Sequence, residues 1–194
     1  SPKGYVFDHF TTISIKENAH TDINMYKKPN WFLESIIITL EQLKKLSMEI
    51  AVLACGCFWG PEIKFSKLKG VIKTEVGYCG GNTEKTTYEE VCTGNTNHAE
   101  VVKIDFDSKI ISYEEILNFF FEIHDPTTLN SQGPDIGTQY RSEIFYLNEN
   151  QKKIAEKVLR DVNERLSGKV VTKISLLKNY CQAEEYHQKY LEKR

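Results

Sequence analysis

The chain has 194 residues, a formal net charge of −2 and 40% hydrophobic residues, which suits one domain with an ordinary core. Its basic residues are dispersed and balanced by acidic ones, so we exclude nucleic acid as a partner. The apolar run around residues 36–38 is much shorter than the roughly 18 residues that a membrane span requires, so we expect no membrane association.

The chain divides near residue 48. Residues 1–47 are of mixed polar composition and contain one amphipathic pattern, at residues 30–46. They contain no arginine and no apolar core of a secretion signal, so they resemble neither a mitochondrial nor a secretory presequence. We therefore predict an N-terminal extension of unknown role at residues 1–47 and a catalytic domain at residues 48–194.

Hydrophobic periodicity predicts an α+β domain after residue 48. A continuous apolar run at residues 49–55 is typical of a buried strand, and residues 100–106 alternate as a half-buried strand does. Ser112 and Glu115 have the spacing of a capping box, which marks a helix start. In chain order we expect a strand at 49–55, a helix at 58–69, strands at 71–78 and 100–106, a helix from 112, a strand at 140–147, a helix at 148–166 and a strand at 170–177.

This order, β-α-β-β-α-β-α-β, indicates a ferredoxin-like plait. In this fold a split βαβ unit forms one sheet, and the helices cover it as the second layer of a two-layer sandwich. The last predicted helix and strand are additions to that fold.

The stretch ACGCFWGPE, at residues 54–62, places two cysteines and two large rings at the predicted strand-to-helix corner. Cys57 falls at or just before the helix N-terminus, where the helix dipole favours a thiolate, so we predict a nucleophile. Cys55 lies inside the apolar strand and is expected to be an inert core thiol. Judged on the thiol alone, Cys57 is equally well explained as a small apolar residue at a bend. Phe58 and Trp59 either cap the core or line a small apolar pocket.

The number of cysteines bears on the compartment. Five cysteines form an odd and sparse set, unlike the dense framework of a small secreted protein. This count predicts free thiols in a reducing compartment, and we expect the cytoplasm.

Seven motifs follow one another in order from about residue 48 to residue 191. They are GCFWG at 56–60, GYxGG at 77–81, TY at 87–88, HAE at 98–100, HDP at 124–126, DIGTQYRS at 135–142 and AEEYHQKY at 183–190. With these motifs the chain resembles peptide methionine sulfoxide reductase of the A type. The resemblance implies a thiol-dependent reduction of methionine-S-sulfoxide, free or in proteins, through a cysteine sulfenic acid, which repairs oxidative damage.

In that family the cysteine of GCFWG attacks the sulfoxide sulfur, which implies this role for Cys57. Glu100 matches the acid that protonates the departing oxygen. Its strand parity places it on the face of Val102 and Ile104, where apolar surroundings raise the pKa of a carboxyl group. Without the motif, a carboxylate at the start of an exposed strand is the simpler interpretation.

The remaining site residues also follow from the resemblance. Tyr88 and Tyr140 match the two phenols that hydrogen-bond the sulfoxide oxygen. Asp135 matches the acidic residue that orients this network, and Phe58 and Trp59 match the pocket for the S-methyl group. Because the chain has ten tyrosines, an ordinary core role for either one stays an alternative.

Two other classes of function stay open at this point. One is an acyl-transfer enzyme with a cysteine and a histidine, and the other is a non-catalytic plait that acts as a binding module. We predict no metal site, because the chain has no C-x₂-C pair and its histidines are scattered. We also expect no cofactor, and a monomer.

The thiol that closes the catalytic cycle has several candidates. Many family members carry resolving cysteines in a glycine-rich C-terminal tail, and no such tail follows the last motif here. A sulfenic acid on Cys57 must condense with some thiol. Cys181 is the best internal candidate, because the resemblance implies that the C-terminal segment passes near the active site. A disulfide to Cys55 closes a strained ring; Cys79 and Cys92 stay open. Direct attack by thioredoxin, glutaredoxin or glutathione is the equal alternative.

Overall fold

A computed structural model describes residues 47–194 of the chain. The amphipathic pattern at residues 30–46 lies outside the described residues. Within the described part, no helix is long and apolar enough to cross a membrane.

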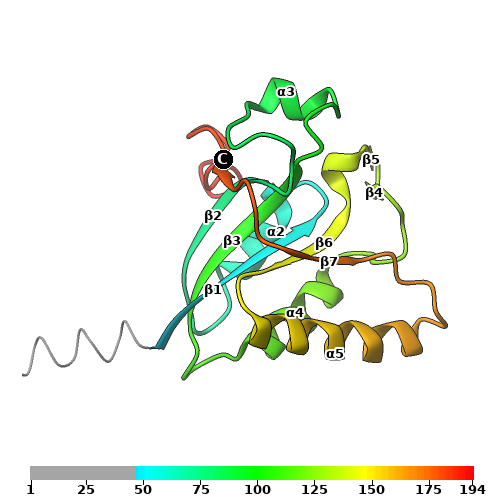
Figure 1. Cartoon of the computed structure of the whole chain (residues 1–194). Coiled ribbons are helices and arrows are strands. Elements are labelled where there is room, and N and C mark those ends of the chain that lie inside the picture. Colours follow the sequence, from blue (N-terminus) through cyan, green and yellow to red (C-terminus); the bar gives the residue numbers. More distant parts are fainter. Residues whose placement is uncertain (1–46) are drawn as a thin grey trace, which may run out of the picture. The chain divides into compact units, whose positions relative to one another are not determined.

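The domain is built on a six-stranded sheet in the order β7-β6-β1-β3-β2-β8 (Figure 1). β3 lies between β1 and β2 and is antiparallel to both, which is the split βαβ arrangement, and β6 is antiparallel to β1 on its other side. The predicted ferredoxin-like plait is confirmed, with β7 added parallel to β6. The strands are β1 (Met48–Cys55), β2 (Val71–Cys79), β3 (Ala99–Asp107), β6 (Ser142–Tyr146), β7 (Lys173–Leu176) and β8 (Cys181–Gln182).

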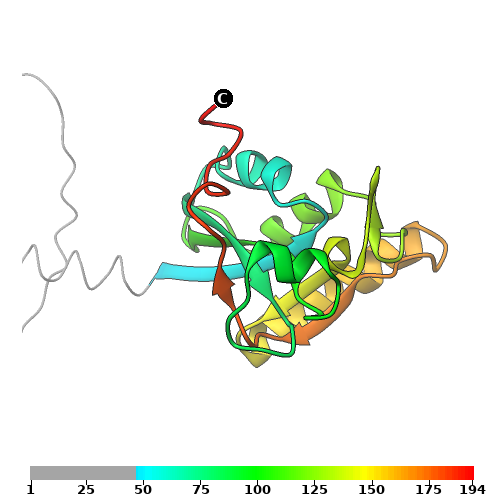
Figure 2. The same ribbon diagram turned by 90° about the horizontal axis from the view of Figure 1, so that it is seen from above.

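Three helices cover one face of this sheet and form the main core with it. They are α2 (Trp59–Phe65), α4 (Tyr113–Ile123) and α5 (Glu149–Arg165). Their buried side chains share one cluster with alternate residues of β1, β2, β3 and β6. On the opposite face the chain packs Leu177 and Tyr180 over a smaller cluster. Figures 1 and 2 show α4 and α5 packed against each other on their side of the sheet.

The helix starts follow the sequence signals. The Ser112 side chain accepts from the backbone N–H of Glu115, and the Glu115 carboxylate accepts from the Ser112 N–H, as the capping box predicts. Asn148 likewise caps α5 through the N–H of Gln151. The helix predicted at 58–69 is shorter, because the chain leaves it after Phe65 in a series of turns.

Several short elements were not predicted. They contain two to five residues, too few to show a hydrophobic period. They are α3 (Tyr88–Cys92), the strand β8 at the sheet edge, the hairpin of β4 (Ser131–Gln132) and β5 (Asp135–Ile136), and the 3₁₀ turn η1 (Thr138–Tyr140).

Candidate active site

The candidate site forms where β1 turns into α2. Gly56 makes this turn with a φ of +88°, and a Cβ there would lie 2.5 Å from the side chain of Gln132, so both conformation and space require glycine. The turn leaves Cys57 half-buried and Phe58 fully buried at the start of the helix.

Glu100, at the start of β3, lies beneath this turn. Its side chain is buried, with 2% of the residue exposed, and its Oε2 accepts the backbone N–H of Phe58 at 3.1 Å. Among the described residues no lysine or arginine pairs with it. Burial, with the nearby charge of Asp135, raises the pKa of Glu100 to about 8, although the Phe58 N–H opposes the shift. This carboxyl group is therefore mainly protonated at neutral pH.

The Cys57 thiol is protonated in the resting structure. Burial is the main cause that raises its pKa to about 11, and the charges of Glu100 and Asp135 add to the shift. Only a hydrogen bond from the backbone N–H of Trp59 acts in the other direction. The expectation of a favoured thiolate is wrong for this state, because the dipole of the seven-residue α2 does not offset desolvation.

Tyr140 and Asp135 approach the cysteine from the segment between α4 and β6. Burial raises the pKa of the Tyr140 hydroxyl to about 12, and the charges of Glu100, Asp135 and Cys57 contribute. Asp135 raises the pKa values of both Glu100 and Cys57. The structure therefore brings these four side chains into one electrostatic cluster.

Tyr88 enters the same cluster from α3. Thr87 caps this short helix in a capping box, and the backbone N–H of Tyr88 donates to Oε1 of Glu184 at 2.9 Å. A hydrogen bond with the Cys92 thiol is the main cause that raises the pKa of the Tyr88 hydroxyl, and the charge of Glu100 adds to it. Sequence reasoning left Cys92 without a defined neighbour, and the structure places it beside Tyr88.

An aromatic wall flanks the cluster. The Phe58 and Trp59 rings lie 6.5 Å apart, Phe58 buried and Trp59 half-buried. Tyr190 stacks on Trp59 at 3.9 Å, and Trp59 Nε1–H donates to Nδ1 of His187 at 3.2 Å. Tyr190 and His187 belong to the AEEYHQKY motif, whose individual positions sequence reasoning did not interpret. The motif itself was the signal that marked them.

Cys181 lies apart from this cluster. It is in β8, opposite Tyr78 of β2, and its thiol donates to the carbonyl of Thr86 at 3.5 Å. Two strands, β2 and β3, lie between β8 and β1 in the sheet. Cys181 is not among the groups whose charges act on the Cys57 thiol. Its role as the resolving thiol stays a prediction.

The described histidines do not form a cysteine–histidine pair with Cys57. His124 uses both ring nitrogens, toward the Phe120 carbonyl at 2.6 Å and the Ser142 hydroxyl at 2.8 Å. His98 contacts the Thr83 carbonyl at 3.0 Å. Residues 47–194 also contain no cluster of three or more side chains that could hold a metal ion.

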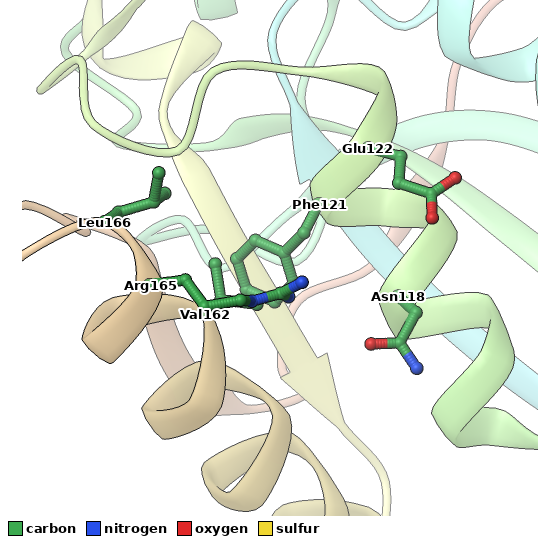
Figure 3. Close-up of a pocket in the computed structure, with 6 residues that line it drawn as sticks. All are labelled: Asn118, Phe121, Glu122, Val162, Arg165 and Leu166. Atoms are coloured by element: carbon green, nitrogen blue, oxygen red, sulfur yellow. The ribbon is translucent and has the colours of Figure 1, made fainter.

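The surface has a further hollow, remote from these residues in the fold. A pocket of about 490 Å³ lies between α4 and α5, and Phe121 of α4 and Arg165 of α5 both line it (Figure 3). None of the candidate site residues lines it. Its lining consists of Asn118, Phe121, Glu122, Val162, Arg165 and Leu166.

The fold and the site together define a class of protein. A cysteine beside a protonated carboxyl group and two phenols is suited to nucleophilic attack with proton delivery to a departing oxygen. An apolar wall suits a neutral group next to the reacting atom. This combination is that of a thiol-dependent enzyme acting on a small oxygenated group.

Comparison with known proteins identifies the family. Residues 49–194 match the sequence model described as "Peptide methionine sulfoxide reductase", and the chain belongs to this family. It is 81% identical to the peptide methionine sulfoxide reductase MsrA of Pelagibacter ubique, over 76% of this chain and 100% of that protein. Its identity to the enzyme of the same name from Saccharolobus solfataricus is 56%, over 75% of this chain and 82% of that protein.

Solved structures agree with this assignment. Reduced Mxr1 from Saccharomyces cerevisiae is similar with a TM-score of 0.74 and 41% identity, covering 77% of this chain and 87% of that chain. Methionine sulfoxide reductase A of Corynebacterium diphtheriae gives 0.73 and 36%, covering 76% of each chain. Mxr1 has also been solved in complex with Trx2, with a TM-score of 0.55 and 26% identity, covering 75% of this chain and 86% of that chain.

Proposed function

We propose that this protein reduces methionine-S-sulfoxide, free or in proteins, to methionine at the expense of thiols, and so repairs oxidised methionine. One observation supports this function most directly. The buried Glu100 carboxyl, with a pKa of about 8, lies beneath the turn that carries Cys57, bonded to the N–H of Phe58. A proton donor is thus held beside a nucleophile at neutral pH.

In the proposed reaction the S-methyl group rests against Phe58 and Trp59, and the sulfoxide oxygen faces Tyr88 and Tyr140. The sulfur of Cys57 attacks the sulfoxide sulfur while the carboxyl group of Glu100 protonates the oxygen, and the thiol proton of Cys57 replaces the one that Glu100 gives up. The new S–S bond and the sulfoxide S–O bond then break as the oxygen, with its proton, passes to Cys57. Methionine leaves with its sulfur reduced, and the thiol becomes a sulfenic acid.

The charges of the cluster fit this sequence of steps. Ionised Glu100 raises the pKa of Cys57, so protonation of the carboxyl group removes one obstacle to forming the thiolate. The phenols of Tyr88 and Tyr140 donate to the oxygen as negative charge develops on it. We assign Asp135 the role of orienting this network, because its charge acts on Glu100, Cys57 and Tyr140 together.

For recycling, we propose that an external thiol attacks the sulfenic acid, releases water and forms a mixed disulfide, which a second thiol reduces. Thioredoxin is the favoured reductant, because a structure of Mxr1 with Trx2 shows that a family member binds one; glutaredoxin and glutathione are the alternatives. An internal role for Cys181, in the edge strand β8, is the alternative to an external thiol. We infer a cytoplasmic location, in keeping with the odd and sparse set of cysteines, and a monomer.

The test uses the full chain with a chromophore-tagged methionine-S-sulfoxide and a dithiol. The expected product is the tagged methionine, and the R epimer serves as the matched control that stays unreduced. Formation of methionine from neither epimer, together with thioester or amide hydrolysis that alkylation of Cys57 abolishes, would favour the acyl-transfer alternative. A chain that does neither would be a binding module.

A further inference from the structure

We propose that His187 is a positioning residue that fixes the indole of Trp59 and thereby the width of the pocket for the substrate's S-alkyl group. This inference rests on the proposed function, in which Trp59 is one wall of that pocket. His187 acts through Trp59 and does not itself touch the substrate.

The indole is held from two sides. Its Nε1–H donates to Nδ1 of His187 at 3.2 Å, and its ring stacks on Tyr190 with centroids 3.9 Å apart and planes inclined by 13°. A hydrogen bond fixes the direction of the indole N–H, while stacking fixes the plane of the ring. Together these contacts leave Trp59 one orientation.

The hydrogen bond also defines the state of His187. Because Nδ1 accepts from Trp59, the ring proton is on Nε2. That nitrogen is buried, has no hydrogen-bond partner among the described residues, and lies 4.0 Å from Oε2 of Glu184. The same carboxylate accepts the Tyr78 hydroxyl and the Tyr88 N–H, each at 2.9 Å. A fixed negative charge thus faces the Nε2–H and favours the tautomer that Trp59 requires.

The position of His187 suits it to support Trp59 and keeps it out of contact with the substrate. Only 1% of the residue is exposed. Its ring centroid lies 5.2 Å from that of Phe58, 5.7 Å from Trp59 and 4.6 Å from Tyr88. It therefore lies behind three residues of the site and supports them from within the protein.

A second anchor ties the same segment to the helix that carries Trp59. Oε2 of the buried Glu62, in α2, accepts the backbone N–H of Lys189 at 2.9 Å. Figure 2 shows the C-terminal segment beside α2. The segment and the helix are thus joined by two hydrogen bonds, at His187 and at Lys189, so His187 is held at a fixed place relative to Trp59.

The test is the first turnover without added reductant, which reports only the sulfoxide step. In His187→Leu the indole N–H loses its acceptor, and we expect apparent substrate affinity to fall roughly 3- to 10-fold, as loss of one hydrogen bond predicts, with the maximal rate within about 3-fold. His187→Asn places an amide oxygen near the position of Nδ1 and should restore affinity to within about 2-fold. The preference for methyl over ethyl sulfoxide should shrink in the Leu variant only.

Trp59→Phe supplies the matched background. It should weaken substrate affinity by itself, and His187→Leu should then have no further effect, because the bond is already absent. Full additivity of the two substitutions would overturn the inference. If Trp59→Phe weakens substrate binding and His187→Leu does not, then Trp59 does form part of the pocket but His187 does not position it. If Trp59→Phe has no effect on affinity, the proposed pocket fails together with the inference.

A measurement on the unaltered protein covers the case in which a variant does not fold. Nitrogen-15 NMR should show a scalar coupling across the hydrogen bond from Trp59 Nε1 to His187 Nδ1, with the ring proton on Nε2. Trp31→Phe removes the other tryptophan and assigns the signal. The proposal would be contradicted by a ring proton on Nδ1 of His187. It would also be contradicted if the Trp59 indole signal is that of a rigid side chain but shows no coupling to His187.

Discussion

The two faces of the sheet each bury a glutamate, and the pair differs in its partners. Glu143, in β6 on the face away from the helices, is 5% exposed and is bonded to the Arg141 guanidinium and the Ser175 hydroxyl. Glu100, in β3 on the helix-covered face, is 2% exposed and receives one backbone N–H. Both carboxyl groups are therefore buried, and they differ in that only Glu143 has a cation beside it.

This difference has a chemical consequence. A buried carboxyl group that is bonded to a cation and a hydroxyl has its charge balanced within the fold and contributes to stability. Without a cation, burial favours the protonated form, and the group becomes a proton donor near neutral pH. Glu100 has this second environment in the structure, next to the only cysteine at the turn between β1 and α2.

The largest effect is expected from removing the Cys57 thiol, which lies above Glu100 in the turn between β1 and α2. Cys57→Ser should lower the first-turnover rate by roughly 10³-fold or more, because a hydroxyl near neutral pH is a poor nucleophile. Rapid-quench measurement of methionine formation gives the rate, and circular dichroism shows whether the fold is retained. Substantial turnover by a folded Cys57→Ser protein would remove this residue from the mechanism.

The difference between Glu100 and Glu143 is tested by one substitution on each face of the sheet. Glu100→Gln removes the proton donor and should slow the first turnover by roughly 10²- to 10⁴-fold. Glu143→Gln leaves the buried Arg141 without a charged partner and should lower the free energy of unfolding by about 3 kcal/mol, with the first-turnover rate little changed. Denaturant unfolding and single-turnover assays on both variants separate the two roles. Equal rate losses would mean that pairing does not distinguish these carboxyl groups.

The pH dependence of the first-turnover rate tests whether Glu100, unlike Glu143, acts as a proton donor. As a general acid, Glu100 acts in its protonated form, so the first-turnover rate should fall as pH rises above about 8, the pKa of this group. Glu100→Gln should lack this alkaline limb. If the limb persists in the Gln variant, the proton comes from another group of the cluster.

Stability should depend on pH in the opposite sense to a paired carboxylate. The pKa of Glu100 is raised from 4.5 in a free chain to about 8 in the folded one, so the folded state keeps a proton that the unfolded state has lost. The free energy of unfolding should therefore decrease as pH rises from about 4.5 to about 8. Urea titrations at several pH values should show that the free energy of unfolding of Glu100→Gln decreases less with pH than that of the unaltered protein. The same decrease in both proteins would mean that Glu100 has an ordinary pKa.

The sequence was sufficient to predict the long elements of the fold. The capping signals at Ser112 and Asn148 and the apolar run of β1 depend on local pattern, so they were readable. The pKa of Cys57 could not be predicted from the sequence, because its raised value comes from burial and from Glu100 and Asp135, which are distant in sequence. Local pattern indicated only the helix dipole.

Partners that depend on short elements were also beyond the sequence. β8 contains only two residues, and its pairing with β2 places Cys181 at the sheet edge, with two strands between it and β1. The hydrophobic pattern of so short a strand could not predict this pairing. The same motif brought His187 against Trp59, which only the folded C-terminal segment reveals.

The smallest effect is expected at Cys181, the thiol in the edge strand β8 that donates to the Thr86 carbonyl. Because β2 and β3 lie between β8 and β1, Cys181→Ser should leave the first turnover unchanged and thioredoxin-driven turnover within about 2-fold, as direct attack on the sulfenic acid predicts. Intact mass after one equivalent of sulfoxide, without reductant, should show a gain of one oxygen in both proteins. Loss of two hydrogens in the unaltered protein, absent in Cys181→Ser, would instead show that β8 leaves the sheet edge and that Cys181 resolves the sulfenic acid.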